Sequence, residues 1–180
     1  MKGKKEDYAI VLDYLPHGYT LEKERIPIIQ ALGVDYFTLF ELIPKKDVKI
    51  ELKEKVYIGE GKRDKIYSIK GKLSPEKLTE TAKINLKEVV HELLTSKPEI
   101  IVKFFNEAEA INKRLHSIEL LPGFGKKHTR DIIKAREEKV FESIEEIKKR
   151  IKNLPDPFKA VEKRIIEELT QKVKYKLFTS

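Results

Sequence analysis

The chain has no cysteine, no tryptophan and a single methionine among its 180 residues. Without cysteine there is neither a disulfide framework nor a thiolate zinc site, and nothing indicates an oxidising compartment. No apolar run approaches the roughly 20 residues that a membrane-spanning helix needs. The apolar run near the N-terminus is interrupted by Asp13 and lacks a small-residue cleavage site. We therefore expect no membrane association and a cytoplasmic location.

Sequence motifs of catalysis are also lacking. The chain contains no nucleophile elbow, no Walker loop and no Rossmann glycine fingerprint. Its four histidines do not share a metal-ligand spacing with one another or with carboxylates. The acidic residues show no grouping that separates a metal-dependent nuclease from a salt-bridged surface. We expect no cofactor, no metal and no enzymatic activity.

Charged residues are abundant and make up 38% of the chain. There are 38 Lys and Arg against 30 Asp and Glu, which gives a net charge of +8. The balance favours a polyanionic partner, but the charge is spread along the chain, so a binding patch must form by clustering in three dimensions. Abundant Lys and Glu, few Gln and Asn, no Cys and one Met form the profile of a heat-adapted, thermophile protein.

The first part of the chain has the pattern of short strands. Alternating β-branched and aromatic runs are separated by Pro, Gly and charged pairs, and the expected strands are Tyr8–Leu15, Val34–Ile43, Val48–Gly59 and Lys65–Leu73. Within the third run, Val48, Ile50 and Leu52 are expected to form one apolar face of the strand. Residues 16–30 are too irregular for an assignment. We expect a small β-barrel over residues 1–73, closed by that irregular segment.

After Leu73 the apolar period becomes helical. Ser74-Pro75 is a helix-start signature, and Ser143 with Glu146 is a capping-box pair. The expected helices cover about 86–95, 98–119, 129–138, a stretch beginning after Ser143, and 158–174. The predicted fold is α+β, with a barrel at 1–73, a connecting helical segment at 74–97 and an all-α domain at 98–180.

The stretch LLPGFGKKHTRDIIKAR contains the most informative motif. Gly123 and Gly125 flank Phe124, and glycine tolerates positive φ and close approach to the backbone. We expect Phe124 to face inward, while the amides of the turn and of the following helix N-terminus face one anion. The basic residues that follow on the expected side of the turn are Lys126, Lys127, His128 and Arg130. The predicted site holds a backbone phosphate and does not read bases. The alternative is a structural turn that joins two helices, since such turns also serve for protein contacts.

The motif recurs in a changed form. Residues 121–133 correspond to residues 154–166, with Leu-Pro at the start and Ile-Ile at the end of both. The second copy has Asp156 and Phe158 where the first has glycines. We interpret the repeat as two related helix-turn-helix units, of which the second keeps a packing role and loses phosphate binding.

The first copy resembles the helix-hairpin-helix motif. In that family, an apolar pair precedes Gly-apolar-Gly, a basic residue and an apolar helix. The resemblance places Gly123, Phe124, Gly125 and Lys127 on the phosphate-contacting positions. Thr129 is a departure, since alanine is frequent there.

The whole chain is similar to a small family of archaeal proteins that carries only a domain-of-unknown-function label. FFNEAEAINKRLHSIELLPGFGKKH is the most distinctive stretch. The resemblance implies an oligonucleotide-binding (OB-like) barrel followed by a tandem helix-hairpin-helix domain. It also implies a role near RNA, because the genes of such proteins lie among translation and rRNA-modification genes.

The barrel offers a second set of candidate contacts. Tyr57 and Tyr67 adjoin the charged turn GEGKRDK and are candidates for base stacking, although aromatic residues at strand spacing usually belong to a core. Lys62 and Arg63 in that turn are candidates for phosphate contact. The alternative is a solvated turn that keeps strand edges apart.

The function predicted from the sequence is non-enzymatic nucleic-acid binding, with RNA favoured over DNA. Ribosomal or transcription proteins are alternative partners, and the chain would then be an adaptor. A DNA repair accessory or nuclease is a further alternative, which would need acidic clusters along the barrel.

Overall fold

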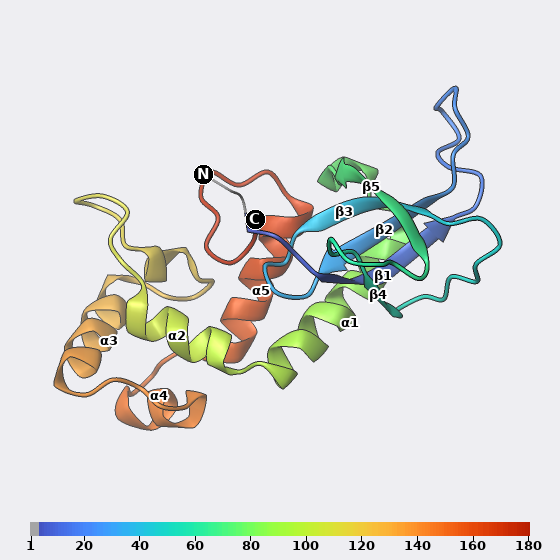
Figure 1. Cartoon of the computed structure of the whole chain (residues 1–180). Coiled ribbons are helices and arrows are strands. Elements are labelled where there is room, and N and C mark those ends of the chain that lie inside the picture. The colour runs from blue at the N-terminus through green and yellow to red at the C-terminus, as the bar shows by residue number, and fades with distance from the viewer. Residues whose placement is uncertain (1–3) are drawn as a thin grey trace. The chain divides into compact units, whose positions relative to one another are not determined.

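The computed structural model describes residues 4–180 and has an α+β fold, as the sequence predicted. The chain forms two compact units (Figure 1). The first comprises the residues up to Val89 together with Glu168–Ser180, and the second comprises Val90–Glu167. The boundaries fall inside helices. These compact units do not define independently folding domains, and the domain limits expected from the sequence stay a prediction.

The first unit is built on an antiparallel five-stranded sheet that curls into a half-barrel (Figure 1). Its spatial order is β4-β1-β2-β3-β5, so β4 and β5 form the two edges. The strands are β1 (Tyr8–Leu15), β2 (Ile28–Gly33), β3 (Leu39–Pro44), β4 (Lys55–Tyr57) and β5 (Ile66–Lys72). A register shift between Val11 and Asp13 marks an irregularity in β1, of the kind that bends a strand and increases its twist.

Apolar side chains fill the half-barrel, and its central strand is buried on both faces. Every residue of β2 is buried. The amide of Gln30 is satisfied there, since Nε2 donates to the Lys77 carbonyl at 2.8 Å and Oε1 accepts from the Thr79 N–H at 3.1 Å. The core cluster consists of Ala9, Val11, Ile29, Ala31, Leu42, Val56, Ile58 and Ile66.

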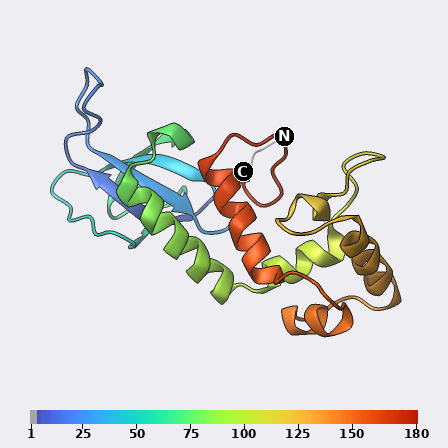
Figure 2. The same cartoon turned by 180° about the vertical axis from the view of Figure 1, so that it is seen from behind.

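Helix α1 (Glu80–Ser96) follows a single 3-10 turn, η1 (Pro75–Lys77). Its first part lies across one face of the sheet (Figure 2), where Ala82 and Leu86 are fully buried. The Asn85 side-chain amide donates to the Leu12 carbonyl at 2.8 Å. Thr79 starts the helix, because its hydroxyl accepts from the Ala82 N–H.

Two strand predictions were wrong. The run Val34–Ile43 is a strand only from Leu39 onward, because residues 34–38 form a turn in which Phe37 adopts a positive φ of 51°. The run 48–59 is a strand only at Lys55–Tyr57, because Asp47 and Lys53 adopt positive φ (60° and 66°) and interrupt the extended chain. Leu52, expected on an apolar face, is 50% exposed. The segment 16–30, which the sequence left unassigned, contains the start of β2, a strand that is buried on both faces and therefore lacks the alternation of a half-exposed strand.

The second unit is helical. Its elements are α2 (Glu99–Glu107), the 3-10 turn η2 (Ser117–Leu120), α3 (Lys126–Glu138), α4 (Ile144–Arg150) and most of α5 (Pro157–Thr170). Ser143 caps α4 as predicted, since its hydroxyl accepts from the Glu146 N–H at 3.0 Å. Within residues 4–180, no helix is both long and apolar enough to cross a membrane.

The long helix expected over 98–119 was wrong. Helix α2 ends at Glu107, and residues 108–116 form a projecting loop closed by a bridge between Ala110 and His116 (Figure 1). The Asn112 side chain accepts from the N–H groups of Arg114 and Leu115 at 2.8 and 3.0 Å. Such local bonds compete with helical ones and stabilise a turn.

Candidate nucleic-acid interface

The Gly-Phe-Gly turn joins η2 to α3. Gly123 has φ of +84°, the left-handed region that glycine tolerates best. The side chain of Phe124 is 5% exposed, and its ring lies 5.7 Å from the rings of both Phe105 and His128. The predicted inward position of Phe124 is therefore confirmed, and its side chain cannot contact a ligand in this conformation.

The backbone amides of the turn are only partly available. The Phe124 N–H donates to the Leu121 carbonyl at 3.0 Å, and the Gly125 N–H donates to His128 Nδ1 at 3.0 Å. The N–H groups of Gly123, Lys126 and Lys127 have no acceptor within the part of the chain that the structure describes. The sequence predicted that the amides of this turn face an anion, and those of Phe124 and Gly125 are instead bonded within the protein.

The side chain of His128 is tied to the turn. Because Nδ1 accepts from the Gly125 N–H, the neutral ring carries its proton on Nε2. Its Nε2–H is the only ring donor left for a ligand. His128 therefore both fixes the turn and keeps one donor for an anion.

The basic side chains around the turn fall into two groups. Lys126 Nζ donates to the Arg114 carbonyl at 2.8 Å and to Glu119 Oε1 at 3.1 Å. Hydrogen bonds from the His116 N–H and from Lys126 lower the pKa of the Glu119 carboxyl. Lys127 and Arg130 are exposed and form no ion pair among residues 4–180. These two side chains are the ones available to a polyanion.

The second hairpin, residues 151–156 between α4 and α5, differs at the corresponding place. Asp156 Oδ1 accepts from the Lys159 N–H at 3.0 Å, so the chain's own carboxylate already lies at the N-terminus of α5. An acidic side chain is favourable at that end of a helix. This hairpin has a built-in anion where the first has glycine.

Of the four candidate residues of the half-barrel, two are bonded within the protein and two are exposed. The Tyr57 hydroxyl accepts from the Gly61 N–H at 3.0 Å, and Arg63 Nε donates to the Gly59 carbonyl at 2.8 Å. Both side chains hold the loop between β4 and β5 together. Tyr67, by contrast, is 72% exposed on the edge strand β5, and Lys62 is exposed. Tyr57 and Arg63 line a cavity of about 530 Å³ together with Phe40 and Ile69.

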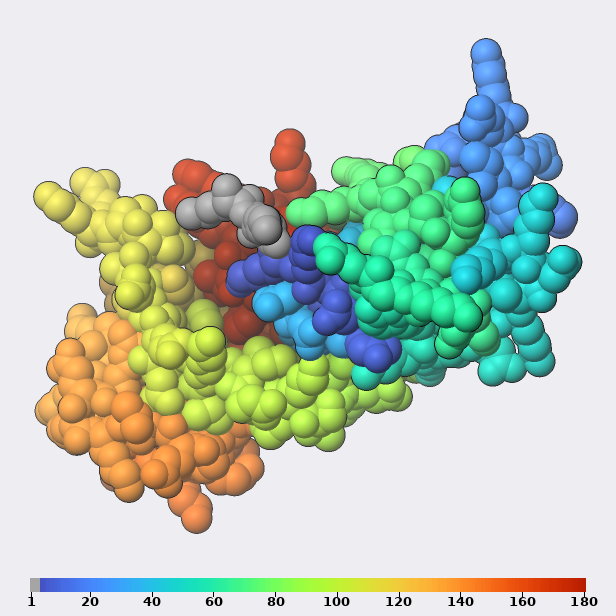
Figure 3. Space-filling view, viewed as in Figure 1, coloured from blue at the N-terminus to red at the C-terminus, as the bar shows by residue number. Residues whose placement is uncertain are grey.

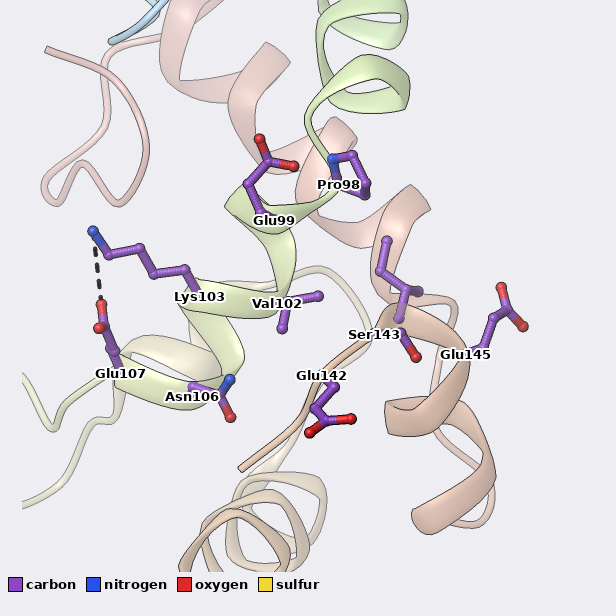
Figure 4. A pocket seen from close by; sticks show the side chains of 10 residues that line it. Pro98, Glu99, Val102, Lys103, Asn106, Glu107, Glu142, Ser143 and Glu145 are labelled. Atoms are coloured by element: carbon purple, nitrogen blue, oxygen red, sulfur yellow. Dashed lines mark ion pairs between the residues drawn. The ribbon is translucent and has the colours of Figure 1, made fainter. Parts of the chain in front are cut away.

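The second unit contains a groove that the sequence did not predict. It lies between α2 and the start of α4 and encloses about 700 Å³ (Figure 4). Pro98, Val102 and Ile144 provide apolar surface, and Lys103 is paired with Glu107 at 3.9 Å. The rim is acidic, with Glu99, Glu107, Glu142 and Glu145. Segments more than thirty residues apart form the groove, so no local pattern reveals it.

No group of three or more His, Asp or Glu side chains with a geometry suited to a metal ion occurs among the described residues.

Comparisons with known proteins agree with the archaeal resemblance. A family model described as "Protein of unknown function (DUF655)" matches residues 5–180. The uncharacterized protein MJ0038 of Methanocaldococcus jannaschii is 48% identical over 177 residues, which are 97% of this chain and 80% of the relative. The crystal structure of Af1531 from Archaeoglobus fulgidus, described as a DUF655 family model, superposes with a TM-score of 0.80 at 41% identity. That match covers 97% of this chain and 100% of the other. The chain belongs to the DUF655 family.

Proposed function

We propose that the protein binds nucleic acid without catalysis, RNA in preference to DNA, and that the turn at Gly123–Gly125 holds a backbone phosphate. In this proposal the half-barrel belongs to an OB-like fold, and the two hairpins form a tandem helix-hairpin-helix unit whose second copy no longer binds phosphate. Tyr67 and Lys62 on the half-barrel are secondary contacts.

One observation carries the proposal. Three N–H groups without an acceptor in the described chain, those of Gly123, Lys126 and Lys127, belong to one turn and the first turn of α3. The exposed cations Lys127 and Arg130 belong to the same segment. Helix N-termini with unsatisfied donors attract anions, and nearby cations add counterion release to the binding free energy.

The experiment is a salt titration of binding to single-stranded RNA, duplex RNA and duplex DNA. Lys127→Glu with Arg130→Glu should remove about two phosphate contacts. For single-stranded RNA, the slope of log K against log salt concentration should become less steep by about 1.4. If the two proteins bind equally at about 1 M salt, this difference makes the variant bind roughly 25-fold more weakly at about 0.1 M salt.

A matched control comes from the second hairpin. Lys159→Glu with Lys163→Glu changes the net charge equally; both lysines are exposed, and in the repeat Lys163 corresponds to Arg130 and Lys159 to Lys126. This control should keep most of the affinity and slope. Equal losses in both double variants would mean that only net charge matters, and no loss in the first would remove the turn from the interface.

The acidic groove favours a second candidate function, that of an adaptor for a protein partner. On a chain with net charge +8, a groove with an acidic rim and apolar floor is complementary to a Lys/Arg-rich segment. Figure 4 shows Val102 projecting from α2 toward the segment before α4, on which Glu142 lies, and both residues line the groove. A 1:1 complex with a basic protein that persists at a salt concentration that releases RNA would favour this function.

A further inference from the structure

The projecting loop of residues 108–116 lies beside the Gly-Phe-Gly turn in the second unit. The Lys126 ammonium donates to the Arg114 carbonyl and to Glu119 Oε1, so the first turn of α3 is bonded to the loop directly. The loop is internally fixed as well. The N–H groups of Ile111 and Asn112 both donate to the Leu115 carbonyl, at 2.8 and 3.1 Å. Figure 3 shows the loop (yellow) standing out from the surface of its unit.

A cleft of about 270 Å³ separates the loop from α3. Four cationic side chains line it, two from the loop and two from α3: Lys113, Arg114, Lys126 and Arg130. Its one acidic side chain is Glu119, which is neutralised by Lys126. Lys113 and Arg114 are exposed and form no ion pair within residues 4–180.

The cleft also has an apolar part. Ala110, Leu115 and Ile133 contribute carbon surface beside the cations. A phosphate alone gains nothing from such surface, whereas a nucleotide has both a phosphate for the cations and a flat base for the apolar side chains. In a duplex, the bases are paired and stacked inside the helix and cannot reach this surface.

We infer that this cleft takes an unpaired nucleotide of single-stranded RNA, next to the phosphate held by the turn, with Lys113 and Arg114 contacting the backbone on its far side. The inference rests on the proposed function and adds to it a preference for single strands. The loop and α3 then contact the RNA strand from two sides. The cleft gives the preference for single-stranded over duplex RNA, whereas the turn binds a phosphate of either form.

The test compares a fluorescent oligouridine RNA with a duplex RNA of the same length. Wild type should bind the single strand more tightly. Lys113→Glu with Arg114→Glu should weaken single-strand binding by roughly 25-fold at about 0.1 M salt, by the loss of two contacts. Duplex binding should weaken much less. Both side chains are exposed at a loop tip, and thermal unfolding should confirm that the fold is unchanged.

A charge-neutral variant separates the cleft from general electrostatics. Leu115→Ala should weaken single-strand binding and leave duplex binding unchanged, because only an unpaired base contacts that surface. Wild-type single-strand affinity in both loop variants, with loss in Lys127→Glu/Arg130→Glu, would overturn the inference and leave the proposed function standing. Wild-type affinity in all three variants would overturn both.

Discussion

At the scale of single residues, Asp156 and Gly125 explain why the N-termini of α5 and α3 differ in their free donors. Asp156 is the N-cap of α5 and satisfies the Lys159 N–H with its own carboxylate. Gly125 is the N-cap of α3 and has no side chain to offer. The N–H groups of Lys126 and Lys127 are left for a ligand in consequence. A cap that stabilises its own helix and a site that binds an external anion use the same donors.

His116 predicts how stability depends on pH. Its Nδ1 accepts from the Ile118 N–H at 3.2 Å, which requires a neutral ring. Desolvation, aided by the positive charge of Arg136 and opposed by Glu119, lowers the pKa of His116 below its ordinary value of 6.5. The unfolded chain therefore binds more protons between these two pKa values. The neutral His116 ring therefore makes its full contribution to the free energy of unfolding above pH 6.5. This contribution is lost as the pH falls through the folded-state pKa of His116.

The measurement is urea unfolding at several pH values between about 5 and 7. His116→Asn keeps a side-chain acceptor for the Ile118 N–H but does not titrate. The free energy of unfolding of this variant should fall less steeply with decreasing pH than that of wild type. Identical slopes would show that His116 does not contribute to the pH dependence.

At the scale of elements, the sequence predicted those whose local signals agree with their tertiary surroundings. Strand β1 matches its alternating run, and α4 begins at its predicted cap. Strand β2 was missed because burial on both faces removes alternation. The break after α2 was missed because an apolar stripe outweighed the turn-forming Asn112, whose side-chain bonds become evident only in the folded loop.

Helix α3 gives a test of its N-terminus as an anion site. Gly125 has an extended φ of −113°, and an added Cβ would meet no atom within 4 Å. Gly125→Asp should therefore fit without strain and cap α3, with stability unchanged or higher by a few tenths of a kcal/mol. Its carboxylate would take the donors that the phosphate needs and repel the phosphate. RNA affinity should fall at least about tenfold, as expected for a charge-assisted contact worth about 1.5 kcal/mol or more.

Thermal unfolding and RNA titration on the same samples check this prediction. Gly125→Ser supplies a neutral cap as the control and should lose less affinity than Gly125→Asp. A Gly125→Asp protein that binds RNA like wild type would show that phosphate does not occupy the N-terminus of α3.

At the scale of the whole molecule, a net charge of +8 favours association with polyanions in general but does not locate a binding site. The candidate turn was predictable because its glycines, phenylalanine and basic residues are consecutive. The cleft was not, since Lys113 and Arg114 come next to α3 only through a loop that replaces the expected helix. The engagement of the Phe124 amide is the i to i+3 bond that a Pro-Gly turn favours, so Pro122-Gly123 could have predicted it. The engagement of the Gly125 amide depends on the side-chain orientation of His128, which the sequence does not give.

The most direct measurement follows every backbone amide of the molecule by NMR during a titration with single-stranded RNA. The N–H signals of Gly123, Lys126 and Lys127 should move downfield on saturation, because each gains a charged acceptor. Those of Phe124 and Gly125 should move less, because they are already bonded within the protein. Saturable RNA binding that leaves the first three signals in place, with shifts gathered elsewhere, would contradict the account.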